Sequence, residues 1–277
     1  MSRLLNGTCL LSISAVLGAP GQQGGSVINY VLNDPELSQK YKLRAITRDV
    51  NSEKAQQLEG KLTSSETALT GVYTIFAMTT PSVSLDGFEV EYKGGKTIND
   101  VAIEKEIFGG MYTEVTPINA KAKVEQYCAF YSPGTFVENL QSQTYLAPRR
   151  VPDGAWVMIR HVSPKTQLPL IDVVGDTGKL TGAILVEPGK HEGKTFYAAT
   201  ALDSVDEVAA IISQATGQTV VYKQIIVEDL RKSFIYQEEF GYFGPDFKEL
   251  VDCAAEDARA KLSTVEEYSK VHPIWFE

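Results

Sequence analysis

The chain has 277 residues, 43% of them hydrophobic and 22% charged, which is the composition of a globular protein. A chain of this length buries roughly 70 to 75% of its unfolded surface, so it needs neither disulfides nor a structural metal for stability. Its formal net charge of -9 disfavours broad contact with the phosphates of nucleic acid. Any role in gene regulation would therefore run through a protein partner, without direct binding of nucleic acid.

Cysteine and histidine are sparse. The three cysteines, at positions 9, 128 and 253, are odd in number and widely spaced, which fits reduced thiols in a cytoplasmic or nuclear protein. No CxxC pair or Cys/His cluster occurs, so we expect no metal site. The apolar run at 10–17 is interrupted on its N-terminal side and leads into a glycine pattern, so we interpret it as a strand and not as a secretory signal. No other stretch has the ~18 apolar residues of a membrane span, and we expect no membrane contact.

The first half of the chain alternates strands and helices. The run at 10–17 predicts a buried strand, the glycines at 18–24 a turn, and the helical spacing of apolar residues from Val27 to Leu32 an amphipathic helix. A second strand at 42–48 completes a βαβ unit with a right-handed crossover. Further elements are predicted as helices at 53–59, 64–70, 88–105 and 119–128 and strands at 72–78 and 129–132.

The second half has more Pro and Gly and predicts strands at 155–162 and 194–200 and helical segments within 245–272. Ser204 with Glu207, and Thr264 with Glu267, have the spacing of capping boxes, which start helices. The fold class predicted is α/β, a Rossmann-type doubly wound parallel sheet with a smaller mixed α/β C-terminal lobe. We predict a nucleotide-binding domain at 1–150 and an interleaved lobe for a substrate or partner at 151–277.

The glycine pattern Gly18-x-x-Gly21-x-x-Gly24 has the chemistry of a phosphate cradle. Glycines let the main chain approach a pyrophosphate, and the following helix directs its free N–H groups at the negative charge. The pattern alone is weak, but its position between a strand and an amphipathic helix is the one that a dinucleotide fingerprint requires. A tight structural turn is the alternative.

The residues at the end of the second strand indicate which of the two cofactors, NAD or NADP, binds. An NAD site usually has an acid there, whereas this chain has Thr47 and Arg48, and a guanidinium can bind a 2′-phosphate. The cofactor predicted is NADP, with NAD still open. The alternative for Arg48 is a surface residue paired with Asp49.

Five segments together resemble the NmrA-like family, whose members are atypical short-chain dehydrogenase/reductases. They are GAPGQQGGSVI at 18–28, RAITRD at 44–49, NAKAKVEQY at 119–127, FVEN at 136–139 and LPLIDVVGDTGK at 168–179. The resemblance covers nearly the whole chain. It implies a Rossmann domain that binds NADP or NAD and a redox-sensing regulator that binds other proteins, as the fungal founder restrains a GATA-type transcription factor.

The resemblance also implies cofactor-binding residues. It places the turn on the pyrophosphate, Arg48 on the 2′-phosphate, the segment after strand 72–78 beside the adenosine, two lysines on the cofactor and a later segment by the nicotinamide. The cofactor-binding residues so predicted are Gly18, Pro20, Gly21, Gln22, Gln23, Gly24, Thr47, Arg48, Thr79, Thr80, Pro81, Lys93, Lys121, Phe136, Glu138 and Asn139.

Lys121 is the one candidate for a catalytic role. Catalytic members of the wider superfamily carry a proton-donating tyrosine four residues before this lysine, and here that position is Pro117, which has no titratable proton. The usual mechanism is therefore missing, although Tyr112 or Tyr131 could serve instead. The alternative for Lys121 is a solvated helix lysine.

The chain also departs from the family pattern in length. It is short after Lys61, Lys105 and Tyr127, where the family would have strands or strand-and-loop pieces. Either the sheet is reduced or residues are missing from the chain.

Three functions stay open from the sequence. The first is an NADP-binding regulator that changes partners with the redox state of the cofactor, with a transcription factor as the kind of partner and a homodimer as a further option. The second is an NADPH-dependent reductase of a small carbonyl, enone or quinone, whose pocket would use the aromatic residues Phe130, Tyr131, Phe136, Tyr242 and Phe243. The alternative for each of these aromatic residues is an ordinary place in the core. The third is a decayed member of the family that binds nothing well.

Overall fold

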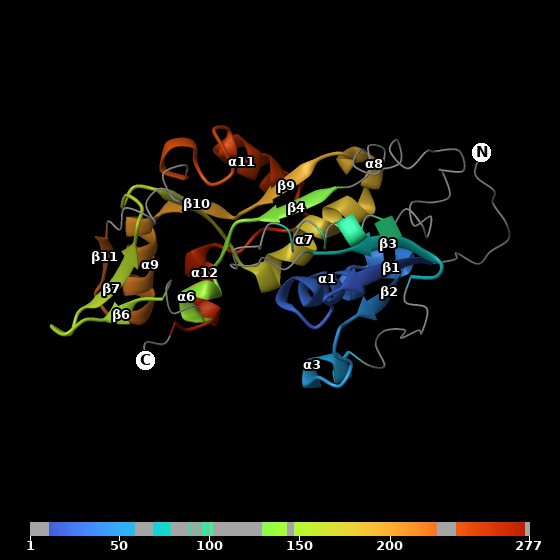
Figure 1. Ribbon diagram of the computed structural model, residues 1–277, viewed down its shortest axis with the longest axis horizontal. Helices are drawn as coiled ribbons and strands as arrows, with labels where there is room; N and C mark the ends of the chain where they lie inside the picture. The colour runs from blue at the N-terminus through green and yellow to red at the C-terminus, as the bar shows by residue number, and fades with distance from the viewer. Residues whose placement is uncertain are drawn as a thin grey trace. The chain divides into compact units, whose positions relative to one another are not determined.

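The computed structural model describes residues 11–58, 69–78, 89, 93, 96–98, 100–101, 129–142, 147–225 and 237–274. The chain divides into two compact units, Met1–Cys128 and Ala129–Glu277, which are described separately. The domain boundary predicted at residue 150 stays a prediction. The α/β class is confirmed, with parallel strand pairs in both units (Figure 1).

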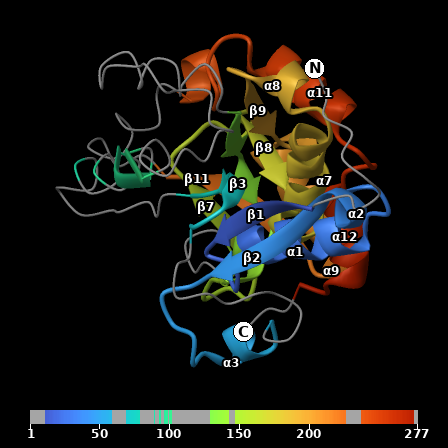
Figure 2. The same cartoon turned by 90° about the vertical axis from the view of Figure 1, so that its right-hand side faces the viewer.

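The first unit contains a three-stranded parallel sheet in the order β2-β1-β3. Its core forms because β1 buries Ala15 and Val16 completely and α1 presents Val27, Ile28 and Val31 to the sheet. Figure 2 shows β1 and β2 side by side with α1 against one face. The elements are β1 Ser12–Leu17, α1 Gln22–Asn33, α2 Leu37–Lys40, β2 Tyr41–Ile46, α3 Glu53–Gln56 and β3 Val72–Phe76.

The predicted strand, turn, helix and second strand are therefore confirmed. The helix predicted at 53–59 is shorter and ends at Gln56. Residues 89, 93, 96–98 and 100–101 are helical and fall within the helix predicted at 88–105. The predicted helix at 119–128 and most of that at 64–70 lie outside the described residues.

The second unit contains three small sheets, in the orders β10-β8-β5, β11-β7-β6 and β4-β9. One core cluster joins α9 and α12 to β7 and β8, and another joins α7 and α11 to β9. The strands are β4 Phe130–Pro133, β5 Thr135–Phe136, β6 Arg149–Arg150, β7 Trp156–Arg160, β8 Gln167–Ile171, β9 Thr195–Ala198, β10 Ala201–Ser204 and β11 Val220–Gln224. The helices are α6 Asn139–Ser142, α7 Val173–Val186, α8 Pro188–His191, α9 Val205–Thr216, α11 Phe247–Asp257 and α12 Val265–Val271.

Both predicted capping boxes are confirmed, since Ser204 with Glu207 starts α9 and Thr264 with Glu267 starts α12. The segment within 245–272 forms two helices, α11 and α12, joined by a short loop. Helix α7 was not predicted, because its three valines and three glycines have low intrinsic helix propensity. Burial of residues such as Leu180 compensates for that low propensity.

Candidate functional site

The turn between β1 and α1 is held by main-chain hydrogen bonds. Gly18 has a φ of +65°, a conformation that residues with a β-carbon rarely adopt, and its carbonyl accepts a hydrogen bond of 2.8 Å from the N–H of Gly21. The N–H of Ala19 donates to the carbonyl of Ile46 at the end of β2, at 3.3 Å. The turn is thereby fixed to the carboxyl edge of the sheet.

Gly24 allows the first turn of α1 to lie directly against this main chain. A β-carbon at Gly24 would lie 2.4 Å from the carbonyl oxygen of Gly18 and 2.8 Å from its carbonyl carbon, which no real structure tolerates. A β-carbon at the neighbouring Gly25 would lie 3.6 Å from the carbonyl oxygen of Ala19, an ordinary contact. The third glycine of the pattern is therefore required by packing, whereas Gly25 is not.

The N-terminus of α1 is open. Its N-cap residue, Gly21, has no side chain to accept a hydrogen bond from the helix, and the first turn contains no acidic residue. The N–H groups of the first helical residues have no partner within a helix, and the helix dipole adds partial positive charge there. Gln22 is exposed and Gln23 is half-buried. This helix end can accept an anion such as a phosphate.

The open helix end lies at a switch point of the sheet. Strand β2 pairs with one side of β1 and β3 with the other, all parallel, so the crossover direction changes at β1. Ligands of open α/β sheets bind at such points, beside the carboxyl ends of the strands. Met78, just after β3, lies 3.9 Å from where a β-carbon of Gly18 would be, so the ends of β1 and β3 are adjacent. The predicted residues Thr79, Thr80 and Pro81 follow directly but lie outside the described residues.

Arg48 extends from a turn just after β2. The hydroxyl of Thr47 lies 3.2 Å from both the N–H and the carbonyl oxygen of Asp49, and the carboxylate of Asp49 accepts a hydrogen bond from the N–H of Asn51. Arg48 itself is exposed, and among the described residues it makes no hydrogen bond or ion pair, including with Asp49. Its guanidinium is therefore available to a ligand.

Of the two predicted lysines, Lys93 is helical and exposed, and its carbonyl accepts a hydrogen bond from the hydroxyl of Thr97. Lys121 lies outside the described residues, as do Tyr112 and Pro117.

The predicted nicotinamide segment, 136–139, lies in the second unit. Phe136 packs against the core cluster around Leu180, and Asn139 begins α6. Glu138 is buried, and its carboxylate accepts hydrogen bonds from the N–H groups of Val173 (3.4 Å) and Val174 (2.9 Å). In this unit Glu138 therefore caps the N-terminus of α7.

A second carboxylate caps the same helix. Asp172 is the N-cap residue of α7 and accepts a hydrogen bond of 2.7 Å from the N–H of Gly175. Burial, together with the nearby charge of Asp172, raises the pKa of Glu138 above its usual value, although the hydrogen bonds oppose this shift. The carboxylates of Glu138 and Asp172 therefore already bind N–H groups at the N-terminus of α7 that an external anion would need.

Asp176 is the centre of a buried polar network that sequence reasoning missed. Its side chain is completely buried and lies 2.7 Å from the ammonium group of Lys179. It also accepts hydrogen bonds from the N–H of Ser263 (2.9 Å) and the hydroxyl of Thr200 (3.3 Å). The segment LPLIDVVGDTGK was recognised only as a family motif, and its aspartates have these structural roles in the fold.

Tyr131, a candidate proton donor, has its hydroxyl 2.9 Å from that of Thr177. Thr177 donates its only hydroxyl proton to the carbonyl of Val173, at 2.7 Å, so the phenol must be the donor to Thr177. Burial raises the pKa of Tyr131 above its usual value. A phenol whose proton is already donated and is harder to lose is a poor general acid or base.

The other candidate aromatic residues differ in their surroundings. Phe130 on β4 is 47% exposed. The rings of Tyr242 and Phe243 contact each other edge to face, and Phe243 makes a second edge-to-face contact with Tyr197, with 5.0 Å between the ring centroids.

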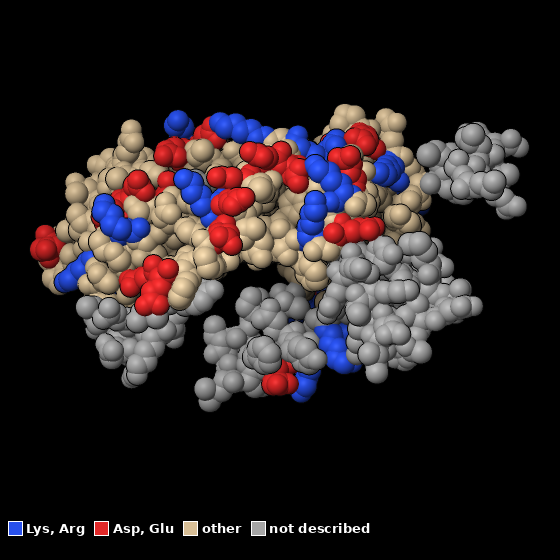
Figure 3. Space-filling model, turned by 90° about the horizontal axis from the view of Figure 1, so that it is seen from above, with Lys and Arg blue, Asp and Glu red and all other residues tan. Residues whose placement is uncertain are grey.

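Metal ligands, membrane spans and surface charge also bear on function. Within the described ranges, no three His, Cys, Asp or Glu side chains are grouped as metal ligands. None of the helices among the described residues is both long and apolar enough to cross a membrane. On the face in Figure 3, acidic and basic residues are intermingled over the described surface, without a broad area of one sign.

The parallel sheet with its glycine turn, switch point and helix N-terminus defines a Rossmann-type α/β fold, in which nucleotides bind at this edge of the sheet. The model of the NmrA-like family matches residues 12–128 and 122–269, and the chain belongs to this family.

One curated relative is the NmrA-like family domain-containing oxidoreductase FrzB of Cladobotryum sp, 25% identical over 88% of this chain and 89% of its own. That alignment runs over 307 positions, more than the 277 residues of this chain, so it opens gaps here.

Two solved structures share the fold. NmrA, a negative transcriptional regulator solved in complex with NAD and with NADP, is 20% identical with a TM-score of 0.70, and the match covers 95% of both chains. The NADPH-dependent quinone oxidoreductase QOR2 of Escherichia coli, solved with NADPH, is 18% identical with a TM-score of 0.58, covering 92% of this chain and 98% of its own.

Proposed function

We propose that this protein binds a nicotinamide dinucleotide at the N-terminus of α1, with NADP(H) preferred over NAD(H). The observation that carries the proposal is the helix end itself, where Gly18, Gly21 and Gly24 bring main chain close and neither the cap nor the first turn of α1 supplies an acid. The residues fit the cofactor, because a pyrophosphate needs this combination of close approach and free donors. The fold neighbours solved with NAD, NADP or NADPH support the same class of ligand.

The preference for NADP(H) rests on Arg48. It follows β2, the strand whose end lies next to the ribose in dinucleotide sites, and it is exposed and unengaged among the described residues. A guanidinium offers several fixed donors to a 2′-phosphate, which NAD lacks.

The role proposed first is that of a regulator that senses redox state in the cytoplasm or nucleus. When bound, the nicotinamide supplies or accepts a hydride, but this chain has Pro117 at the position of the usual tyrosine, and Tyr131 is committed to Thr177. A protein that binds the cofactor without proton transfer can still report its redox state, provided that a partner has different affinities for the two forms. A regulatory role is supported by the shared fold of NmrA, a negative transcriptional regulator solved in complex with NAD.

The second candidate is an NADPH-dependent reductase of a small carbonyl, enone or quinone. The names of the curated relatives favour it, since FrzB and its counterpart lnaB of Aspergillus flavus are both called oxidoreductases.

Calorimetric titration of NADPH, NADP and NADH tests the cofactor proposal. We expect Arg48→Ala to weaken NADPH about tenfold, equivalent to about 1.4 kcal/mol, and to leave NADH unchanged. The control is Lys54→Ala, which removes an exposed positive charge from α3 and should alter neither ligand. Equal losses in the two variants would show that only net charge matters.

Activity separates the two roles. Steady oxidation of NADPH with a panel of quinones and enones would establish the reductase. Absence of turnover, together with a partner that binds the NADPH and NADP forms unequally, would establish the regulator.

A further inference from the structure

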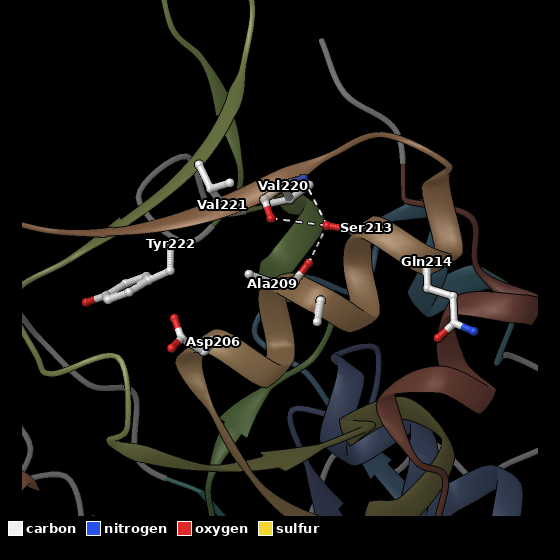
Figure 4. A pocket seen from close by; sticks show the side chains of 8 residues that line it. Asp206, Ala209, Ser213, Gln214, Val220, Val221 and Tyr222 are labelled. Carbon is white, nitrogen blue, oxygen red and sulfur yellow. Dashed lines mark hydrogen bonds between the residues drawn. The ribbon is translucent and has the colours of Figure 1, made fainter.

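A hollow of about 730 Å³ lies between helix α9 and strand β11, far along the chain from the glycine turn. Figure 4 shows its lining residues, with α9 on one side and β11 on the other. It is lined by Asp206, Ala210, Ser213 and Gln214 of α9 and by Val220 and Tyr222 of β11, among others. The volume is within the range of sites that hold small ligands or short peptide segments.

Strand β11 is the edge of its sheet in the described part of the chain, with β7 on its inner side. The N–H of Ile225 donates a hydrogen bond of 2.8 Å to the carbonyl of Arg160 at the end of β7, so the main-chain groups of Ile225 face β7. Because these groups alternate between the two edges of a strand, those of Lys223 and Val221 face β7 as well. The N–H and C=O groups of Val220, Tyr222 and Gln224 therefore point away from β7.

Among the described residues, Val220 is the one of these three whose outward groups meet a side chain. The hydroxyl of Ser213 accepts a hydrogen bond from the N–H of Val220 (2.9 Å), and its single proton faces the carbonyls of Ala209 (2.8 Å) and Val220 (3.1 Å), as Figure 4 shows. No described residue bonds the outward groups of Tyr222 and Gln224. An edge with free donors and acceptors beside a hollow is the arrangement that adds an extended peptide as a further strand.

The lining indicates which peptide fits. Ala210 and Ser213 are small and leave room for side chains of the added strand, whereas Asp206, beside Tyr222, is the one charged residue lining the hollow among the described residues. Its partner Lys165 is 3.6 Å away with a side chain 81% exposed, so this ion pair is weak and easily replaced. A basic side chain from the peptide would take its place, in keeping with the net charge of -9.

We propose that the edge of β11 and the hollow beside α9 bind an extended, basic segment of a partner protein by strand addition. This inference goes beyond nucleotide binding and does not depend on it.

The test uses three acetylated eight-residue peptides and fluorescence anisotropy. The first alternates Val and Lys, the second alternates Val and Glu, and the third is the lysine peptide with every backbone nitrogen methylated. We expect the lysine peptide to bind saturably and the other two at least tenfold more weakly, because one lacks the charge and the other the main-chain donors. Equal binding of all three, or no binding at millimolar peptide, would overturn the proposal.

Two variants locate the binding site. Asp206→Lys should weaken the lysine peptide at least tenfold and strengthen the glutamate peptide, whereas Asp252→Lys, the same charge change at an exposed position of α11, should do neither. Ala210→Phe, also at an exposed helix position, should fill the hollow and abolish binding. If the Asp206 and Asp252 variants behaved alike, or if the wild type formed a dimer that Ala210→Phe abolished, the partner segment would be excluded as the occupant.

Discussion

The N-termini of α1 and α7 have the same intrinsic affinity for negative charge and use it differently. At α1 the cap is a glycine and the first turn has no acid, so the N–H groups are left for a ligand. At α7 the carboxylates of Asp172 and Glu138 bind the N–H groups of Val173, Val174 and Gly175. The same helix-end chemistry thus stabilises the fold at α7 and is available for binding at α1.

At each of these two helix ends, a glycine lets another group lie close to the main chain. A β-carbon at Gly175 would lie 2.3 Å from the carboxylate of Asp172, so this glycine lets the protein's own acid reach α7. Gly24 lets α1 lie against the carbonyl of Gly18 and builds the turn that an external phosphate can reach. The contact at Gly24 is with main chain, which cannot give way, whereas that at Gly175 is with a side chain that would have to leave its capping position.

The largest effect should come from Gly24→Ala. Its methyl group would force α1 away from the turn, and we expect loss of NADPH binding by more than tenfold and a fall of about 1–3 kcal/mol in the free energy of unfolding. Enhancement of NADPH fluorescence and denaturant unfolding measure the two effects. Gly25→Ala is the matched control, since its methyl group has room and should leave binding intact while stabilising the helix by up to about 1 kcal/mol.

A carboxylate at the cap of α1 should turn it into a helix end like that of α7. Gly21→Asp would supply an internal anion, and we expect NADPH binding to fall about tenfold relative to Gly21→Asn, which adds a side chain of the same size without the charge. The comparison between the two variants cancels the strain of a β-carbon 3.0 Å from the carbonyl of Gly18. Equal affinities would show that negative charge at this helix end does not compete with the ligand.

Removing the cap of α7 should cost stability and spare binding. Asp172→Ala leaves the N–H of Gly175 without its acceptor, and we expect a loss of about 1–2 kcal/mol in the free energy of unfolding. Calorimetric titration of NADPH should give the wild-type dissociation constant. A large loss of affinity would mean that the N-terminus of α7, and not only that of α1, serves the ligand.

The smallest effect concerns pH. The pKa of Glu138 is raised in the folded protein, so the folded state holds this proton more tightly than the unfolded state does. Its contribution to stability is fully present below the unfolded pKa, near 4.5, and is lost as the pH rises through the folded pKa. Glu138→Gln should remove this part of the pH dependence, measured as the difference between the unfolding free energies of variant and wild type from pH 4 to 8. A difference that does not change with pH would contradict the assignment.

The sequence predicts a feature well when the residues that form it are close together along the chain. The turn, α1 and the two capping boxes depend on residues within a few positions of each other, and local spacing was enough to find them. The carboxylate of Glu138 reaches α7 from 35 residues away, and Asp176 contacts Ser263 from 87 residues away. Spacing along the chain carries no signal for such contacts, so the structural roles of Glu138 and Asp176 become visible only in the fold.

The central claim is that the first-turn N–H groups of α1 bind the phosphates of NADPH. Amide NMR of the uniformly ¹⁵N-labelled protein during an NADPH titration tests it most directly. We predict that the amide signals of Gln22, Gln23 and Gly24 shift saturably with the dissociation constant found by calorimetry, while those of Val173, Val174 and Gly175 at α7 stay in place. Unmoved signals at 22–24 in the presence of saturating, bound NADPH would contradict the account.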